Sequence, residues 1–284
     1  MMTVIEAINL STDYLAKKNI ESPRINAEHL LAHILKCKRL NLYLSFDRPL
    51  KDDEVNNYRE LLVRRSKAEP LQYIVGNVEF YGLEFDVNPA VLIPRPETEL
   101  LVEKIIQNLK DENNLRILDV GTGSGNIAVA LAKNIVNCEI IGIDISKEAL
   151  KIAQTNAEKN GVSDKISFKK MDIFNTDNFT DGSFNILVSN PPYISIEEYP
   201  QLRPELIVYE PRVALTDNAD GLQFYRSISE KAQSLLKENG KIYFEMGMGQ
   251  ASAIAKILEE NSFRDIRIDK DYSNIERIIS GVKN

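Results

Sequence analysis

Hydrophobic residues in the first 68 positions recur every three or four residues, which places them on one face of a helix. Three runs show this spacing: Ile5, Ile8 and Leu15; Ala27, Leu30, Leu31, Ile34 and Leu35; and Val55, Tyr58, Leu61 and Leu62. Ser22-Pro23 and Asp52-Asp53 stand where helices are expected to begin. No strand pattern interrupts these runs, so they predict a small helical bundle. The bundle has no obvious catalytic residue of its own.

An alternating pattern follows the bundle. Apolar residues lie on both sides of Tyr81-Gly82: Val78 and Phe80 before it, and Leu83, Phe85 and Val87 after it. This predicts a β-hairpin in which the glycine permits the turn. The stretch Ile93-Pro94-Arg95-Pro96-Glu97 then predicts an extended connector, because each proline favours extended geometry in the residue before it. Pro96 suits the first turn of a following helix.

Strand and helix patterns alternate from Leu115 to the end of the chain. The expected strands are Leu115–Val120, Glu139–Asp144, Ile166–Asp172, Phe184–Ser189, Lys241–Glu245, Phe263–Asp269 and Ile275–Val282. The expected helices are Ile127–Ala132, Glu148–Lys159, Leu222–Leu236 and Ala251–Glu259. Alternation of this kind predicts an α/β fold, a parallel sheet with helices on both faces. The last two strands have no helix between them, so we expect an antiparallel hairpin at one edge of the sheet.

These patterns divide the chain into a helical bundle at residues 1–75, a hairpin and proline-rich connector at 76–97, and an α/β domain at 98–284. No apolar run is long enough to span a membrane, and the N-terminus lacks a signal-peptide pattern, so we expect a cytoplasmic protein. Cys37 and Cys138 are far apart in the sequence and are expected to be free thiols. The formal net charge of −7 argues mildly against a general nucleic-acid binder.

Metal binding is not expected. His29 and His33 are the only histidines, and their four-residue spacing could suit a metal on a helix. No acid or cysteine pattern completes such a site, so we interpret both as surface or packing residues. The basic run Arg64-Arg65-Ser66-Lys67 is a candidate nucleic-acid patch, although a solvated helix face is the favoured interpretation.

A glycine-rich turn ends the first strand of the α/β domain. Asp119-Val120 is followed at once by Gly121, Thr122, Gly123, Ser124 and Gly125, and a helix is predicted directly after them. Glycines let the backbone turn sharply and let a ligand approach closely. The dinucleotide fingerprint is not met, because Asn126 stands where its last glycine should be, and no Gly-Lys-Ser/Thr completes a P-loop. The alternative is a tight strand–helix turn without a ligand.

Two further strand ends carry acids that suit a nucleoside. Asp144 ends the second strand about 20 residues past the glycines, where it can accept both hydroxyl groups of a ribose, and Ile145 follows it. At the end of the third strand, Asp172 can accept from an adenine amino group and Ile173 can cover the adenine face. Each acid alone could be a helix cap, but their order along successive strands favours one shared ligand.

The fourth strand ends in Asn190-Pro191-Pro192-Tyr193. The prolines stiffen the backbone, which leaves the Asn190 side-chain oxygen, a backbone carbonyl and the Tyr193 ring as a rim. Two acceptors and a flat ring are suited to hold a planar NH2 group. Asn190, Pro191, Pro192 and Tyr193 are therefore the candidate catalytic residues, and Asn190 also borders the cofactor pocket.

A nucleoside without a phosphate clamp, next to a clamp for an NH2 group, indicates S-adenosylmethionine and transfer of its methyl group to nitrogen. An amide nitrogen is a poor nucleophile because its lone pair is delocalised. Acceptors that draw both N–H bonds out of the amide plane would raise the electron density on that nitrogen. Position and polarisation are then the catalytic effects, and no strong base is needed before transfer.

With these residues in view, the chain resembles the N(5)-glutamine methyltransferases of peptide chain release factors, the PrmC/HemK family, over nearly its whole length. The shared motifs are Pro70-Leu71-Gln72-Tyr73-Ile74 with Gly76, Phe80-Tyr81-Gly82, Leu92–Glu99, Asp119–Gly125, Gly142-Ile143-Asp144, Asn190–Tyr193, Tyr209-Glu210-Pro211 and Glu245-Met246-Gly247. The connector Ile-Pro-Arg-Pro-Glu-Thr-Glu is the most specific of them. One departure is Tyr272–Arg277, where only the arginine end of the usual pattern is present.

The resemblance implies a Rossmann-like, seven-stranded class I S-adenosylmethionine methyltransferase sheet with an N-terminal helical domain. It implies that the bundle helps dock a release factor, and that the substrate is the glutamine of its Gly-Gly-Gln loop. Residues Gly121 to Gly125, Asp144 and Ile173 would hold the cofactor, while Asn190, Pro191 and Tyr193 would hold the glutamine amide. Arg95 and Glu210 would brace loops. We expect a monomer that binds no nucleic acid directly.

Two rival functions remain open from the sequence. An adenine-N6 methyltransferase acting on RNA or DNA would use the same Asn190 clamp on a flipped base and would need a basic surface beside Tyr193. A non-catalytic nucleoside-binding module would have no use for the rim at Asn190–Tyr193. The acidic net charge and the helical N-terminal region argue against the first rival.

Overall fold

The computed structural model describes residues 1–109, 114–175 and 182–284. The chain forms two compact units. The smaller comprises Met1–Asn77 together with Pro204–Tyr209, and the larger comprises Val78–Arg203 and Glu210–Asn284. Within the described ranges, no helix is long and apolar enough to cross a membrane.

The smaller unit consists of short helices, as the hydrophobic spacing predicts. Their bounds are α1 Val4–Lys17, α2 Pro23–Ile34, α3 Arg39–Leu44, α4 Asp52–Ser66 and α5 Leu71–Val75. Helix α1 begins with a capping box, in which the Thr3 and Glu6 side chains each bond the other residue's backbone N–H. Proline begins α2 and Asp52 begins α4, at the two starts expected from the sequence.

The core of this unit forms where the apolar faces of α1, α2 and α4 meet. Tyr58 is only 1% exposed, and its hydroxyl donates to the Ala27 carbonyl at 3.0 Å, which ties α4 to α2. Burying a tyrosine is favourable only when its hydroxyl has such a partner.

A helix from the second half of the sequence also packs in this unit. Helix α9, Pro204–Tyr209, contributes Glu205, which pairs with the buried Arg65 at 2.6 Å. The Tyr209 hydroxyl donates to the Lys67 carbonyl at 3.0 Å. Arg65 also donates to Asn26 Oδ1 at 2.6 Å, so its guanidinium is an organising group of the unit. The basic run that contains Arg65 is therefore partly internal.

The predicted hairpin is formed by β1 Asn77–Phe80 and β2 Leu83–Asp86, and all of it but Asn77 belongs to the larger unit. Both residues of its turn have positive φ, +51° at Tyr81 and +70° at Gly82. This is the backbone geometry that suits a two-residue hairpin. The Tyr81 N–H donates to Glu99 Oε1 at 2.8 Å, which fixes the turn against helix α6, Pro96–Asn108.

The main sheet has seven strands, in agreement with the sequence prediction. They are β3 Leu115–Val120, β4 Cys138–Asp144, β5 Ile166–Lys170, β6 Phe184–Ser189, β7 Leu236–Glu245, β8 Phe263–Lys270 and β9 Glu276–Lys283. Their order in space is β5-β4-β3-β6-β7-β9-β8. All neighbours pair in parallel except β9, which is antiparallel to both β7 and β8.

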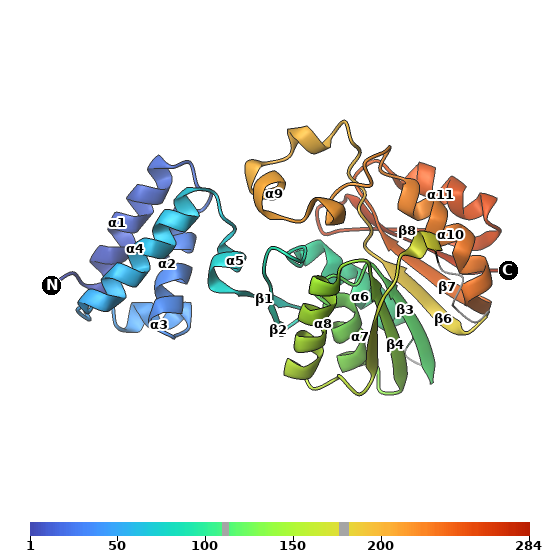
Figure 1. The fold of residues 1–284 in the computed structure, drawn as a ribbon, viewed down its shortest axis with the longest axis horizontal. Coiled ribbons are helices and arrows are strands. Elements are labelled where there is room, and N and C mark those ends of the chain that lie inside the picture. The colour runs from blue at the N-terminus through green and yellow to red at the C-terminus, as the bar shows by residue number, and fades with distance from the viewer. Residues whose placement is uncertain (110–113, 176–181) are drawn as a thin grey trace. The chain divides into compact units, whose positions relative to one another are not determined.

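Helices cover both faces of this sheet, as Figure 1 shows. On one face lie α6 Pro96–Asn108, α7 Asn126–Asn134 and α8 Lys147–Lys159, which pack with the hairpin. On the other face lie α10 Gln223–Leu235 and α11 Ala251–Glu260. Strands between two helix layers bury both of their faces, so β3 and β6 are buried at nearly every position rather than at alternate ones.

Two strands differ from the sequence expectation by more than one residue at one end. Strand β5 stops at Lys170, so Met171 and Asp172 lie beyond it, and β7 begins five residues earlier than the expected Lys241. The closing hairpin is confirmed, although only β8 lies at the sheet edge, because β9 inserts beside β7. Its turn is closed by Asp271, which accepts from the N–H groups of Ser273 and Ile275.

Candidate functional site

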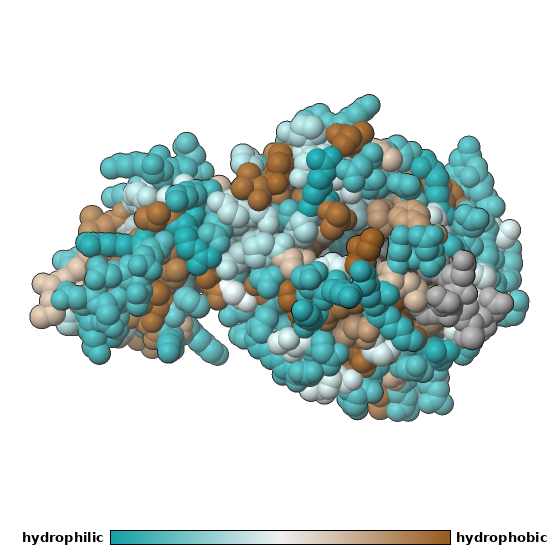
Figure 2. Space-filling model, viewed as in Figure 1, coloured by the Kyte–Doolittle hydropathy of each residue, from teal (hydrophilic) through white to brown (hydrophobic). Residues whose placement is uncertain are grey.

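A cavity of about 290 Å³ opens at the carboxyl ends of β3, β4 and β6, within the larger unit. Parallel strands place all their carboxyl ends at one edge, where ligands of open α/β sheets bind. In Figure 2 the larger unit is hollowed at this place, and brown apolar surface lies around the opening. The volume is close to the lower end of the roughly 300–1,000 Å³ typical of small-ligand sites.

The glycine turn forms part of the cavity floor. Gly121 and Gly123 line it with φ values of +73° and +55°, and a Cβ at Gly121 would meet nothing within 4 Å. The turn is thus an open backbone cradle on the cavity side. Gly125 instead faces α8, where a Cβ would lie 3.0 Å from the Ala153 Cβ. The third glycine therefore allows close helix packing rather than ligand contact.

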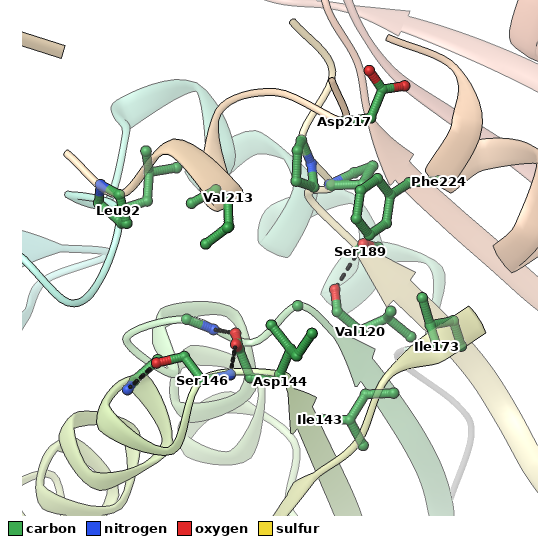
Figure 3. Close-up of a pocket in the computed structure, with 18 of the residues that line it drawn as sticks. Leu92, Val120, Ile143, Asp144, Ser146, Ile173, Ser189, Val213, Asp217 and Phe224 are labelled. Atoms are coloured by element: carbon green, nitrogen blue, oxygen red, sulfur yellow. Dashed lines mark hydrogen bonds between the residues drawn. The ribbon is translucent and has the colours of Figure 1, made fainter. Parts of the chain in front are cut away.

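Asp144 holds the glycine turn and the next loop together (Figure 3). Its carboxylate accepts from the Gly123 N–H at 3.0 Å and from the Ser146 N–H at 2.9 Å. Burial raises its pKa above the ordinary value, and these backbone hydrogen bonds oppose that rise. A carboxylate offers about four lone-pair positions, so Asp144 keeps acceptor capacity for hydroxyl groups of a ligand. Ile145 lines the cavity beside it and is 57% exposed.

The segment after β5 supplies an apolar wall. Ile173 lies in a short 3₁₀ helix, Ile173–Asn175, and Figure 3 shows it beside Ile143 and Val120. Asp172 also lines the cavity, but its carboxylate accepts from the Phe174 N–H and from the Asn175 side chain, both at 3.0 Å. Its first role is therefore to close its own turn.

Asn190, Pro191 and Pro192 line the cavity directly after β6. The Asn190 Nδ2 atom donates to Thr98 Oγ1 at 3.2 Å. Ser189, directly before the motif, is fully buried, and its hydroxyl donates to the Val120 carbonyl at 2.7 Å. This bond holds the motif beside the glycine turn.

Four of the residues predicted from the sequence lie outside the cavity lining: Thr122, Ser124, Gly125 and Tyr193. The Tyr193 ring packs against Gly247, where a Cβ would lie 3.2 Å from its Cδ2. Its carbonyl accepts from Gln250 Nε2 at 2.9 Å. Burial raises the pKa of Tyr193 to about 12, so its hydroxyl stays protonated at neutral pH.

One wall of the cavity was missed by the sequence analysis. It comes from the connector and from the segment before α10, and Figure 3 shows Leu92 and Val213 on the side opposite Asp144. Arg95 pairs with Glu210 at 2.5 Å, and Glu210 also accepts from the Ile93 N–H at 3.3 Å. Arg95 and Glu210 thus join the two segments behind this wall. The motif Tyr209-Glu210-Pro211 was the signal that could have indicated it.

The charge of the cavity lining disfavours binding of a ligand that carries phosphate groups. Among the described residues that line it there is no Lys, Arg or His, whereas Asp144, Asp172 and Asp217 are present. Such a lining favours a cationic group over an anionic one. Directly beneath the glycine turn, Asp119 is fully buried and accepts from the Thr122 hydroxyl at 2.6 Å. Burial, and then the nearby Asp144 charge, raise the pKa of Asp119 to about 7.

This donor set fits S-adenosylmethionine. The carboxylate of Asp144 suits ribose hydroxyls, the wall at Ile173 suits an adenine face, and the acidic lining suits a sulfonium and an ammonium group. The described residues contain no cluster of three or more His, Cys, Asp or Glu side chains that could hold a metal ion.

Known proteins with similar sequences and folds agree with this fit. Residues 111–278 match the family model described as "Methyltransferase domain", and residues 6–76 match "PrmC N-terminal domain". A crystal structure of a methyltransferase from Pyrococcus furiosus superposes with a TM-score of 0.54 at 17% identity, over 81% of this chain and 98% of that one. The sheet and the cavity at its carboxyl edge are those of an S-adenosylmethionine-dependent methyltransferase.

Proteins with similar sequences show which family of methyltransferases the chain belongs to. The "Release factor glutamine methyltransferase" of Fusobacterium nucleatum is 41% identical over 280 residues, which is 98% of this chain and 78% of the relative. Relatives of the same name from Geobacter sulfurreducens and Chlorobaculum tepidum are 39% and 40% identical, each over 98% of this chain and 96% of the relative. The chain belongs to the release factor glutamine methyltransferase family.

The loop that carries Tyr193 depends on a glycine. Gly221 has φ +79°, and a Cβ there would lie 2.4 Å from the Tyr193 carbonyl oxygen. Gly161 has a similar φ of +68° but open space around it. We expect Gly161→Ala to cost about 1 kcal/mol, and Gly221→Ala to cost about 1–3 kcal/mol more and to lower methyl transfer. Urea unfolding and turnover measure both. Equal losses in the two variants would contradict this role for Gly221.

The buried Asp119 predicts a pH-dependent stability. Its folded pKa of about 7 exceeds its unfolded value of 3.8, so the folded state binds the extra proton. Protonation of Asp119 therefore contributes fully to folding stability below about pH 4, and this contribution is lost as the pH rises through 7. We expect the free energy of unfolding of Asp119→Asn, relative to wild type, to rise by a few kcal/mol between about pH 5 and pH 8. A difference that does not change with pH would contradict the shift.

Proposed function

We propose that this protein transfers the methyl group of S-adenosylmethionine to the side-chain amide nitrogen of the glutamine in the Gly-Gly-Gln loop of peptide chain release factors, and so supports translation termination. The observation that carries this proposal is the position of Asn190, at the rim of an acidic, cation-free cavity that adjoins the glycine turn. The shared name of the relatives supports a release factor as the substrate.

In this proposal the cofactor-binding residues are those of the glycine turn and its neighbours. Gly121 and Gly123 would face the amino acid part through their backbone, with Thr122, Ser124 and Gly125 shaping the turn. Asp144 would accept from the ribose hydroxyls. Ile145, Asp172 and Ile173 would surround the adenine. Asn190 would border both the cofactor and the substrate.

Bound S-adenosylmethionine supplies an electrophilic methyl group on a sulfonium. The protein's task is to turn a weak amide nucleophile toward it. Asn190 Oδ1 and a backbone carbonyl of the Asn190-Pro191-Pro192 segment accept the two N–H bonds of the glutamine amide. Because the prolines fix these acceptors, the amide reaches its reactive orientation without further ordering of the protein. After transfer, the methylated nitrogen would release one proton to solvent and so become a neutral amide.

Tyr193 has a supporting role in this proposal. Its ring packs against Gly247 and its carbonyl is held by Gln250, so it anchors the end of the motif. Contact with the amide would require the ring to turn toward the cavity when the substrate binds.

The helical unit is proposed to dock the release factor. Four apolar side chains lie exposed on α3 and directly after it, with exposures of 72%, 46%, 81% and 55%: Leu40, Tyr43, Leu44 and Phe46. A small unit that exposes this much apolar surface in one short segment presents a protein-binding patch. We further propose that the protein acts as a cytoplasmic monomer and does not bind nucleic acid directly.

Removing the Asn190 amide tests the clamp. We expect Asn190→Ala to reduce methyl transfer by on the order of a thousandfold, because the acceptor that polarises the glutamine amide is lost. Binding of S-adenosylmethionine, measured by titration calorimetry, should remain near normal. Unchanged turnover in this variant would refute the role of Asn190.

The docking patch is tested by a matched pair of variants in the helical unit. We expect Leu44→Ser to raise KM for intact release factor about tenfold. Its turnover on a short Gly-Gly-Gln peptide should be unchanged, because such a peptide lacks the rest of the release factor that would contact the patch. Leu10→Ser removes a side chain that is also exposed, at 62% on α1, and should have no effect. Equal KM values for the two variants would place docking elsewhere.

A labelling experiment identifies the class of molecule that receives the methyl group. The protein is incubated with methyl-labelled S-adenosylmethionine and, in separate reactions, with a release factor, ribosomal RNA and DNA. We expect label in the release factor alone, and a release factor with its Gly-Gly-Gln glutamine changed to alanine should take up none. Label in the adenine of RNA or DNA would replace the proposal with an adenine-N6 methyltransferase.

A further inference from the structure

The side chain of Asn190 is held from behind by two buried polar residues. Thr98, in the first turn of α6, is 1% exposed, and its hydroxyl receives the Asn190 Nδ2 hydrogen bond at 3.2 Å. Glu245, the last residue of β7, is 3% exposed. Ser189 pairs with Phe244 in the sheet, so Asn190 and Glu245 are the next residues of two adjacent parallel strands.

Glu245 is an unusual residue to bury. Its Oε2 has no hydrogen-bond partner among the described residues. Burial raises its pKa to about 7, hydrogen bonds from Thr98 and Asn190 oppose this rise, and the nearby Glu97 adds to it. A buried carboxyl group with one oxygen that lacks a partner is destabilising, so its presence here calls for an explanation.

The charge state of Glu245 determines how the Asn190 amide is oriented. An ionised carboxylate only accepts hydrogen bonds, so the Thr98 hydroxyl donates to it and has lone pairs left for the Asn190 NH2 group. The NH2 group then points inward and Oδ1 faces the cavity. A protonated Glu245 can donate instead, and the Thr98 hydroxyl is then free to donate to Asn190 Oδ1. The amide would turn over and present NH2 to a substrate that also carries NH2.

We propose that Thr98 and Glu245 are positioning residues that hold the Asn190 oxygen toward the substrate, and that methyl transfer requires Glu245 to be ionised. This inference rests on the proposed function, because it specifies how the clamp for the glutamine amide is aligned. Neither residue lines the cavity, and neither needs to touch the substrate.

Among the described residues, two charged side chains act on Glu245. Glu97 on α6 and Arg277 on β9 act on it in opposite directions. Tyr193 is the last residue of the Asn190–Tyr193 motif, and Tyr225 on α10 donates from its hydroxyl to the Glu245 carbonyl at 2.9 Å. Burial raises the pKa of both tyrosines, so neither titrates near neutral pH. Asp119 has a pKa of about 7 but lies under the glycine turn, where its titration would affect cofactor affinity.

A pH profile tests the required ionisation. Turnover is measured with saturating cofactor and release factor from about pH 5.5 to 9. We expect the wild-type rate to fall below about pH 7 with a single ionisation. Glu245→Gln should lack this fall, and its rate at high pH should be about tenfold to a hundredfold lower, because its amide no longer forces one orientation. A variant with the wild-type rate, or with the same acidic fall, overturns the inference.

A hydroxyl exchange tests the other residue. Thr98→Val keeps the shape but removes the hydroxyl, and we expect a loss of about tenfold or more in kcat with cofactor affinity unchanged. Thr98→Ser restores the hydroxyl and should recover most of the rate. Melting curves of both variants control for folding. Equal kcat in the valine and serine variants overturns the inference.

The two proposals fail in different ways. If wild-type protein labels no release factor, the proposed function is wrong and this inference fails with it. If wild-type protein labels the factor while the Glu245 and Thr98 variants match it in rate and pH profile, only the inference is wrong. An acidic fall that appears in cofactor affinity instead of kcat would assign the ionisation to Asp119.

Discussion

Parallel pairing of β3 with its two neighbours is the constraint on which the rest of the structure depends. Val120 is in register with Ile143 on one side and with Ser189 on the other, so β3, β4 and β6 end together. The glycine turn and Asn190 directly follow β3 and β6, and Asp144 is the last residue of β4, so all three border one cavity. A slip of one residue in any of the three strands would send its final side chain to the other face.

Two buried acids at this edge of the sheet lower the stability of the fold. Asp119 and Glu245 are both almost fully buried, and each has one oxygen without a hydrogen-bond partner among the described residues. Burial raises the pKa of each to about 7, so both carboxyl groups destabilise the fold when they ionise near neutral pH. The apolar layers on both sheet faces offset this loss. Packing away from the site supplies the stability that allows these two carboxyl groups to stay buried at the site.

The elements of this fold could be predicted from the sequence because their signals are local. Hydrophobic spacing identified the strands and the longer helices, and the residues at and after strand ends identified most of the cavity floor. The remainder depends on contacts between distant segments, which no local pattern encodes. Val213 lines the cavity in a segment where Glu210 is joined to Arg95, 115 positions away in the sequence. Tyr193 looks like part of the rim, but Gly247 leaves room for its ring to pack elsewhere.

The proposed transfer moves a positive charge from sulfur to the amide nitrogen, and the charges of this site suit both ends of that movement. Before transfer, the positive charge on sulfur would lie in an acidic cavity whose described lining contains no basic residue. At the end the charge lies beside Asn190 Oδ1, with the carboxyl group of Glu245 behind it. In a site that excludes water, a fixed negative charge attracts a nearby positive charge more strongly than it would in solvent. An ionised Glu245 would therefore stabilise the transition state through the same amide that it orients, and a neutral hydrogen-bond partner at that position could supply only the orientation.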